Sequence, residues 1–238
     1  MWMSRGSVLS RLRTSFENLP TVVRGLVVVQ TLLYLFFVLL RLLGMELEVA
    51  QHCVFIPPLF LDGTFWTPLT YFWVHVSSDL FGWLFDVVIL WTLGGIFARR
   101  WRGGHFLFFV VASSILAAGV DLLLYLAIGA SFAAAASGMS AGSFALFVAF
   151  YYVFGDAPVS VLGSPPMRGR TVFFAIVGLE TVLFLAGNNP AFGIQLGGLF
   201  SGWLLVTGRW RPAKLGAWVS GLFARFRKDP KSRFRIIN

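Results

Sequence analysis

The sequence predicts an all-α membrane protein: a bundle of six transmembrane helices with both termini in the cytoplasm. Composition is the first reason, because 58% of the 238 residues are hydrophobic and only 12% are charged. Soluble domains carry roughly 25% charged residues, so this chain has too few polar groups to cover its surface in water. The lengths of the apolar segments and the distribution of the basic residues are the other two reasons.

Six apolar segments each approach the length of a transmembrane helix, which needs about 20 mostly apolar residues. In chain order they cover residues 22–43, 80–98, 106–128, 140–154, 171–186 and 192–207. The 26 phenylalanines and 9 tryptophans suit contact with lipid and anchoring at the membrane interface. The sequence therefore predicts six spans, the last three of them short.

Nearly all basic residues fall in segments that six spans would place on one side of the membrane. These segments are residues 1–24, 99–102, 168–170 and 209–238. Arg41 alone departs from the pattern, and its long side chain can reach the interface. Because cytoplasmic loops are rich in Lys and Arg, both termini are predicted to be cytoplasmic. The net charge of +9 then suits anionic lipid head groups, and no nucleic-acid binding is expected.

The chain divides into three parts. Residues 1–21 form a cytoplasmic N-terminal segment, residues 22–208 form the membrane domain, and residues 209–238 form a basic cytoplasmic tail. Apolar residues at helical spacing in the tail predict an interfacial helix. The long loop of residues 44–79 is too apolar to be solvated, so we expect short helices there, partly within the outer leaflet.

Two motifs far apart in the sequence carry the candidate chemistry. Ser140 lies among small residues at the head of the fourth span, on a turn that offers backbone N–H groups for an oxyanion. The sixth span contains glycines four residues apart, which allow close approach of a neighbouring helix, here the fourth span. Gln195 lies near that face. The glycines predicted to pack against another helix are Gly193, Gly197, Gly198 and Gly202.

These two motifs resemble the rhomboid intramembrane serine proteases. That family has Gly-x-Ser at the head of the fourth span and Ala-His-x-Gly-Gly-x-x-x-Gly in the sixth, where this chain reads Ile-Gln-Leu-Gly-Gly-Leu-Phe-Ser-Gly over residues 194–202. The aromatic-rich segment 66–75 and the segment 85–94 also look like the start and the body of rhomboid span two. The resemblance implies a rhomboid-like bundle and covers spans two to six.

The departures from the family pattern fall at the positions that matter for catalysis. By resemblance, Ser140 holds the nucleophile position, and Gln195 replaces the general-base histidine. Gly82 and Asp86 replace the histidine and asparagine on the oxyanion side. A glutamine can hydrogen-bond the Ser140 hydroxyl but cannot serve as the base that a serine nucleophile needs, and an ionised Asp86 would oppose an oxyanion.

The sequence therefore favours a catalytically inactive rhomboid-like protein that binds transmembrane segments of client proteins, as inactive relatives such as the derlins do. An active rhomboid intramembrane serine endopeptidase is the alternative. A proton- or ion-coupled transporter is the third possibility, because Asp86, Asp121 and Glu180 all lie in predicted spans. The sequence leaves the roles of Asp121 and Glu180 open.

The remaining expectations concern single residue types. His52, His75 and His105 are expected in loops or at the interface, with none placed to meet Ser140. One cysteine, Cys53, excludes an intramolecular disulfide. No cofactor or metal ion is expected, and the expected partners are the lipid bilayer and transmembrane segments. The lack of glycosylation sequons and of a cleavable signal peptide favours a bacterial inner membrane. Client and oligomeric state stay open.

Overall fold

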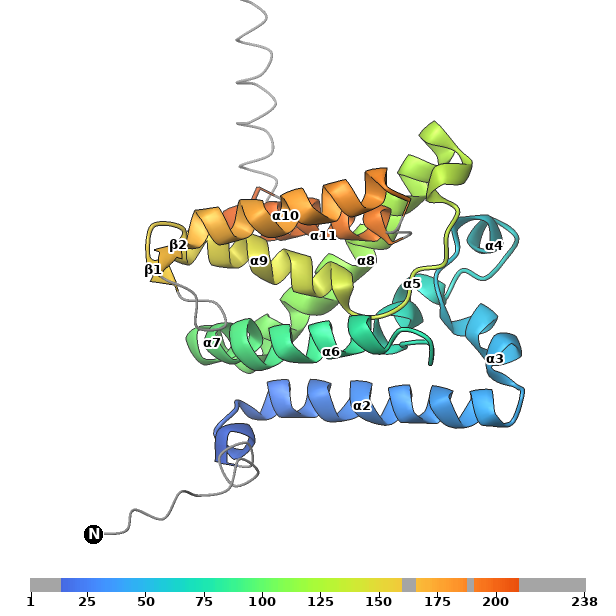
Figure 1. Cartoon of the computed structure of the whole chain (residues 1–238), viewed down its shortest axis with the longest axis horizontal. Coiled ribbons are helices and arrows are strands. Elements are labelled where there is room, and N and C mark those ends of the chain that lie inside the picture. The colour runs from blue at the N-terminus through green and yellow to red at the C-terminus, as the bar shows by residue number, and fades with distance from the viewer. Residues whose placement is uncertain (1–13, 160–165, 188–190, 210–238) are drawn as a thin grey trace, which may run out of the picture.

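A computed structural model describes residues 14–159, 166–187 and 191–209, and this part of the chain is predominantly helical (Figure 1). The long helical elements are α2 (Thr21–Leu42), α6 (Leu80–Ile89), η2 (Leu90–Gly94), α7 (Gly95–Arg100), α8 (Gly103–Ile128), α9 (Ser140–Phe154), α10 (Gly169–Leu185) and α11 (Phe192–Thr207). They cover the six apolar segments predicted from the sequence, with ends that shift by a few residues. The predicted helical class is confirmed.

Three of the described helices are long and apolar enough to cross a membrane: Thr21–Leu42, Leu80–Arg100 and Gly103–Ile128. The second joins α6 and α7 through η2, a π-helical turn. Helices α9 and α11 are apolar but shorter, and the count of six spans stays a prediction. The basic tail, apart from its first residue Arg209, lies outside the described residues, and so does the interfacial helix predicted in it.

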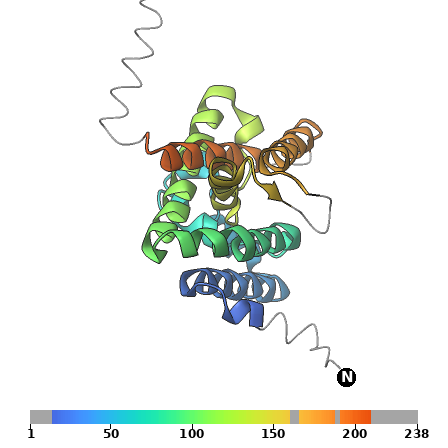
Figure 2. The same ribbon diagram turned by 90° about the vertical axis from the view of Figure 1, so that its left-hand side faces the viewer.

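Helix α9 lies at the centre of the bundle. Seen end-on in Figure 2, it is surrounded by α6, α8, α10 and α11. Every residue from Ala141 to Phe150 is buried, which is the pattern of a helix that is apolar on all sides. Ser140, the first residue of α9, is therefore fixed in place by the most buried helix of the molecule.

Helix α11 packs against α8 on one side and α9 on the other, through glycines. A Cβ at Gly197 would lie 2.6 Å from the Ala117 Cα in α8, and one at Gly202 would lie 2.7 Å from the Ala145 Cα in α9. Both distances are shorter than real Cβ contacts, so any side chain would push the helices apart. The glycines thus face two helices, where the sequence had suggested the fourth span alone.

The loop between α2 and α6 contains the expected short helices, which gather at one end of the bundle (Figure 1). They are α3 (Glu46–Cys53), α4 (Pro57–Leu61), α5 (Thr67–Thr70) and η1 (Tyr71–Trp73). The Tyr71 hydroxyl donates a hydrogen bond of 2.6 Å to the Ser114 carbonyl oxygen in α8. Burial raises the pKa of Tyr71 well above its usual value, so this hydroxyl remains a donor.

Two smaller elements complete the described fold. The 3-10 turn η3 (Ala130–Phe132) follows α8, and strands β1 (Pro158–Val159) and β2 (Met167–Arg168) pair antiparallel between α9 and α10. This strand pair lies at the end of the bundle opposite α3, α4 and α5 (Figure 1). It holds the start of α10 close to the end of α9.

We expect Gly198→Ala to destabilise the protein by about 1–3 kcal/mol, the usual cost of overpacking. A Cβ at Gly198 would overlap the Ala141 carbonyl oxygen, so α11 must move away from α9. Gly119→Ala in α8 is the matched control, because a Cβ there meets nothing within 4 Å and alanine favours a helix. Thermal unfolding in detergent measures both, and equal midpoints would contradict the close-packing argument.

Candidate functional site

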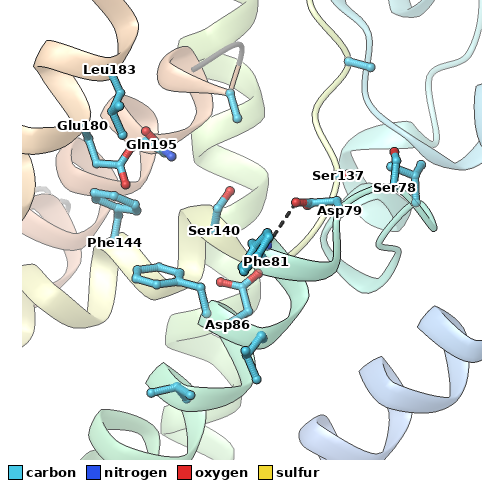
Figure 3. A pocket seen from close by; sticks show the side chains of 17 residues that line it. Ser78, Asp79, Phe81, Asp86, Ser137, Ser140, Phe144, Glu180, Leu183 and Gln195 are labelled. Atoms are coloured by element: carbon cyan, nitrogen blue, oxygen red, sulfur yellow. Dashed lines mark hydrogen bonds between the residues drawn. The ribbon is translucent and has the colours of Figure 1, made fainter. Parts of the chain in front are cut away.

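A cavity of about 840 Å³ lies between α6, the start of α9, α10 and the start of α11. Figure 3 shows the side chains that line it. All four residues that the sequence placed at the candidate site are among them: Gly82, Asp86, Ser140 and Gln195. The fold therefore brings the two distant motifs and the second span to one place, although their individual contacts differ from those expected.

The Ser140 hydroxyl has no partner. Its Oγ atom is buried and makes no hydrogen bond with any described residue. The contact with the Gln195 side chain that would have joined the two motifs is therefore absent. Because Ser140 Oγ borders the cavity, a polar group entering the cavity would find an unused donor and acceptor there.

Gln195 contacts α10 instead of α9. Its side chain is hydrogen-bonded to the Glu180 carboxylate, and Figure 3 shows the two side chains adjacent, away from Ser140. Gln195 is 9% exposed, so this bond is shielded from competing water. The amide at the general-base position thus links α11 to α10, and an amide offers no basic nitrogen to the Ser140 proton.

Asp86 accepts two hydrogen bonds in the core of the bundle. His75 Nε2 lies 3.0 Å from Asp86 Oδ2, and the Ser143 hydroxyl donates to Asp86 Oδ1 at 2.6 Å. The three residues are each no more than 1% exposed. The buried Nδ1 of His75 has no partner among the described residues, so Nε2 is the ring nitrogen that joins His75 to Asp86.

His75 lies in the loop between η1 and α6, as expected, but its side chain is buried in this cluster. The chain after η1 turns inward, and His75 becomes 1% exposed. Asp86 was expected to face an oxyanion site with its charge. Both of its carboxyl oxygens instead take part in hydrogen bonds, one with His75 and one with Ser143. The sequence did contain a signal: an acid inside the membrane needs a partner, and His75 is the histidine nearest to Asp86 along the chain.

Gly138 lets the chain before α9 pass close to His75 and Asp86. Its φ is +82°, which glycine adopts without strain, and its N–H lies 2.6 Å from the Val74 carbonyl oxygen. A Cβ at Gly138 would lie 2.8 Å from His75 Cδ2 and 3.2 Å from Asp86 Oδ2. Gly138, two residues before Ser140, therefore allows the backbone to pack directly against the buried His75–Asp86 pair.

Gly82 has a local structural role. Asp79 caps α6 by accepting the Gly82 N–H at 3.0 Å, and a Cβ at Gly82 would collide with the Asp79 carboxylate. Burial raises the pKa of Asp79, and the nearby His75 and the Gly82 amide partly oppose that rise. Gly82 thus serves to start the helix.

The cavity is acidic. Asp79, Asp86 and Glu180 line it, and no Lys or Arg does among the described residues. Asp121 is buried at 4% exposure in α8 beside Gly193, outside this cavity, so the acids of the predicted spans do not gather at one point. No group of three or more potential metal ligands occurs within the described residues.

Comparison with known families identifies the chain at the level of its fold and membrane setting. Residues 24–207 match the family model described as eukaryotic integral membrane protein (DUF1751). The chain belongs to this family. The match covers the described helices from α2 to α11, and no curated protein matches the chain.

Membership of this eukaryotic family corrects the predicted location. The preference for a bacterial inner membrane was wrong. It rested on missing sequons and a missing cleavable signal peptide, and neither distinguishes the two settings, because a long first apolar span can direct insertion without being removed. The family does support a multi-pass integral membrane protein, as the composition predicted.

We expect Asp86→Ala to destabilise the protein by about 2 kcal/mol or more. The change leaves the His75 N–H and the Ser143 hydroxyl buried without an acceptor, and each such group costs about 1–3 kcal/mol. Asp156→Ala is the control, because its partner Arg170 is on the surface and such pairs contribute about 0–1 kcal/mol. If thermal unfolding shows the same loss for both variants, Asp86 does not hold the core together.

Proposed function

We propose that this protein is a rhomboid-like, catalytically inactive membrane protein that binds transmembrane segments of client proteins between α6 and α10. The observation that carries the proposal is the cavity itself, with a polar floor and apolar walls in the middle of a helical membrane bundle. The rhomboid part rests on the motif resemblance together with the meeting of Ser140, Gln195 and Asp86 at one cavity.

The absence of protease activity is supported by the bonding of the site. Serine needs a base within hydrogen-bond reach, about 2.6–3.2 Å, to become a nucleophile. Ser140 Oγ has no such partner among the described residues. The Gln195 amide is engaged with Glu180, and His75 Nε2 is engaged with Asp86.

Binding of a client helix is supported by the surfaces on both sides of the cavity. On α6, Phe81 is 82% exposed and Leu84 is 45% exposed. On α10, Leu179 is 59% exposed and Val182 is 61% exposed. In a bilayer these side chains face lipid or another helix. A client helix packed there gains van der Waals contact along both walls, which is what drives helix association in membranes.

Helix α10 buries few of its residues. Its only buried residues are Gly169 and Val172, near the strand pair, whereas the cavity lies beside its far end at Glu180 and Leu183. A helix with few buried contacts along most of its length moves easily. The far end contacts α11 through the stacked rings of Phe184 and Phe192 and through Glu180, so an entering client helix would have to displace these contacts.

The polar floor supports selection among clients. The Ser140 hydroxyl is unpaired, and Glu180 and Asp79 contribute carboxylate oxygens. A polar side chain in a transmembrane helix is costly in lipid and would find hydrogen-bond partners here. We therefore expect clients whose membrane segment carries a polar residue in the outer half.

Site-directed photocrosslinking tests the binding proposal. The full chain is reconstituted in vesicles with a single-span model helix that carries one central glutamine, and a photoreactive side chain replaces Phe81. We expect crosslinks from position 81 and few from the control position Leu32, which is 61% exposed on α2. Leu183→Trp, which fills the cavity, should lower the yield at position 81. Equal yields from both positions would remove the support for a specific site.

The alternative function, an active rhomboid serine endopeptidase, has one observation in its favour: the buried His75 packs against Gly138, which lies two residues before Ser140 in the chain. A fluorophosphonate probe separates the two functions. We expect no difference in labelling between wild type and Ser140→Ala, because no base activates the hydroxyl. Labelling of wild type that Ser140→Ala abolishes would establish the alternative, and Gln195→His tests whether a restored base recovers labelling.

A further inference from the structure

A second cavity, of about 690 Å³, lies at the opposite end of α9 and α11 from Ser140. It is a groove between the start of α8, the end of α9 and the end of α11, at the end of the bundle that faces the viewer in Figure 2. Its walls are mainly apolar, with Phe108 and Trp101 on one side and Val153 and Val206 on the other. We call it the basal groove.

We propose that the basal groove binds one anionic glycerophospholipid, whose phosphate contacts Arg102 and His105 and whose acyl chain lies along the apolar wall. Arg102 and His105 line the groove, and no Asp or Glu among the described residues does. Neither side chain has a hydrogen-bond or ion-pair partner within the described part of the chain. The groove thus carries uncompensated positive charge beside an apolar surface.

The backbone at the start of α8 adds to this positive potential. Helix α8 is 26 residues long, has no acidic residue in its first turn, and has no side-chain cap. Its first N–H groups are therefore left for another acceptor, and a helix N-terminus favours a phosphate. A Cβ at Gly104 would meet nothing within 4 Å, so a head group can approach the backbone there.

The position of the groove in the membrane identifies the occupant as a lipid. The groove lies at the end of the bundle that carries Arg99, Arg100, Arg102 and Arg209, which the positive-inside rule assigns to the cytoplasmic face. Anionic phospholipids are concentrated in that leaflet, and basic pockets between helices bind their head groups. A soluble anion would use the basic residues alone, whereas an acyl chain also covers Phe108 and Val206.

Equilibrium binding of fluorescent lipids to the full chain in neutral detergent tests the proposal. We expect phosphatidylserine to bind about tenfold more tightly than phosphatidylcholine with the same acyl chains, a factor that corresponds to about 1.4 kcal/mol. The double change Arg102→Gln and His105→Gln should abolish this preference, because it removes the charged contacts. Val206→Trp, which fills the apolar wall, should weaken the binding of both lipids.

Arg100→Gln is the matched control, because Arg100 is exposed in the same segment but does not line the groove. It removes one positive charge and should leave the preference for phosphatidylserine intact. An equal loss in Arg100→Gln and Arg102→Gln, or no preference in wild type, would overturn the proposal in favour of general attraction by surface charge.

Crosslinking in vesicles that contain phosphatidylserine distinguishes the lipid from a protein occupant. A photoreactive side chain replaces Phe108, which is 58% exposed. A crosslink to lipid that Val206→Trp suppresses supports the proposal. A crosslink to residues 210–238 of the same chain, with none to lipid, would show that the tail occupies the groove and would overturn it.

Discussion

The hydrogen bonds at Asp86 join α6 to the loop just before it and to α9, which is 57 residues further along the chain. His75 comes from the end of the outer loop, Asp86 from α6, and Ser143 from the first turn of α9. A buried carboxylate with an unmet bond is costly, so the three elements can move apart only at considerable expense. The cavity, the turn at Gly138 and the position of Ser140 all depend on this junction.

The hydrogen bonds of Asp86 also differ from those in the catalytic triad of a serine protease. In a serine protease the histidine is shared between the nucleophile and the acid, whereas here the acid is central and holds a histidine and a different serine, Ser143. Ser140 is left beside the cavity with its hydroxyl unused. His75, Asp86 and Ser143 hold the loop before α6, α6 itself and α9 together through these two hydrogen bonds.

The helices could be predicted from the sequence because hydropathy and length are local properties. Residues 140–154 and 192–207 were predicted as helical with the bounds that the structure has. The convergence of Ser140, Gln195 and Asp86 followed from motif resemblance. The pairing of Gln195 with Glu180 could not be predicted, because it depends on which side chains tertiary packing brings together, whereas the need of Asp86 for a partner pointed to His75. The predicted bacterial location was wrong, because missing sequons and a missing cleavable signal peptide do not distinguish a bacterial from a eukaryotic membrane protein.

The buried residues of α10 lie at its start, so a tilt of this helix would pivot near Gly169. Eleven residues separate Gly169 from Glu180, which at the rise of an α-helix is an arm of about 16 Å. A tilt of about 10° at that end therefore displaces Glu180 by about 3 Å, enough to break its hydrogen bond with Gln195. Under the proposed function, a tilt that widened the cavity would also part the Phe184–Phe192 stack and release the Gln195 amide, so an entering helix would meet both a wider space and a freed polar group.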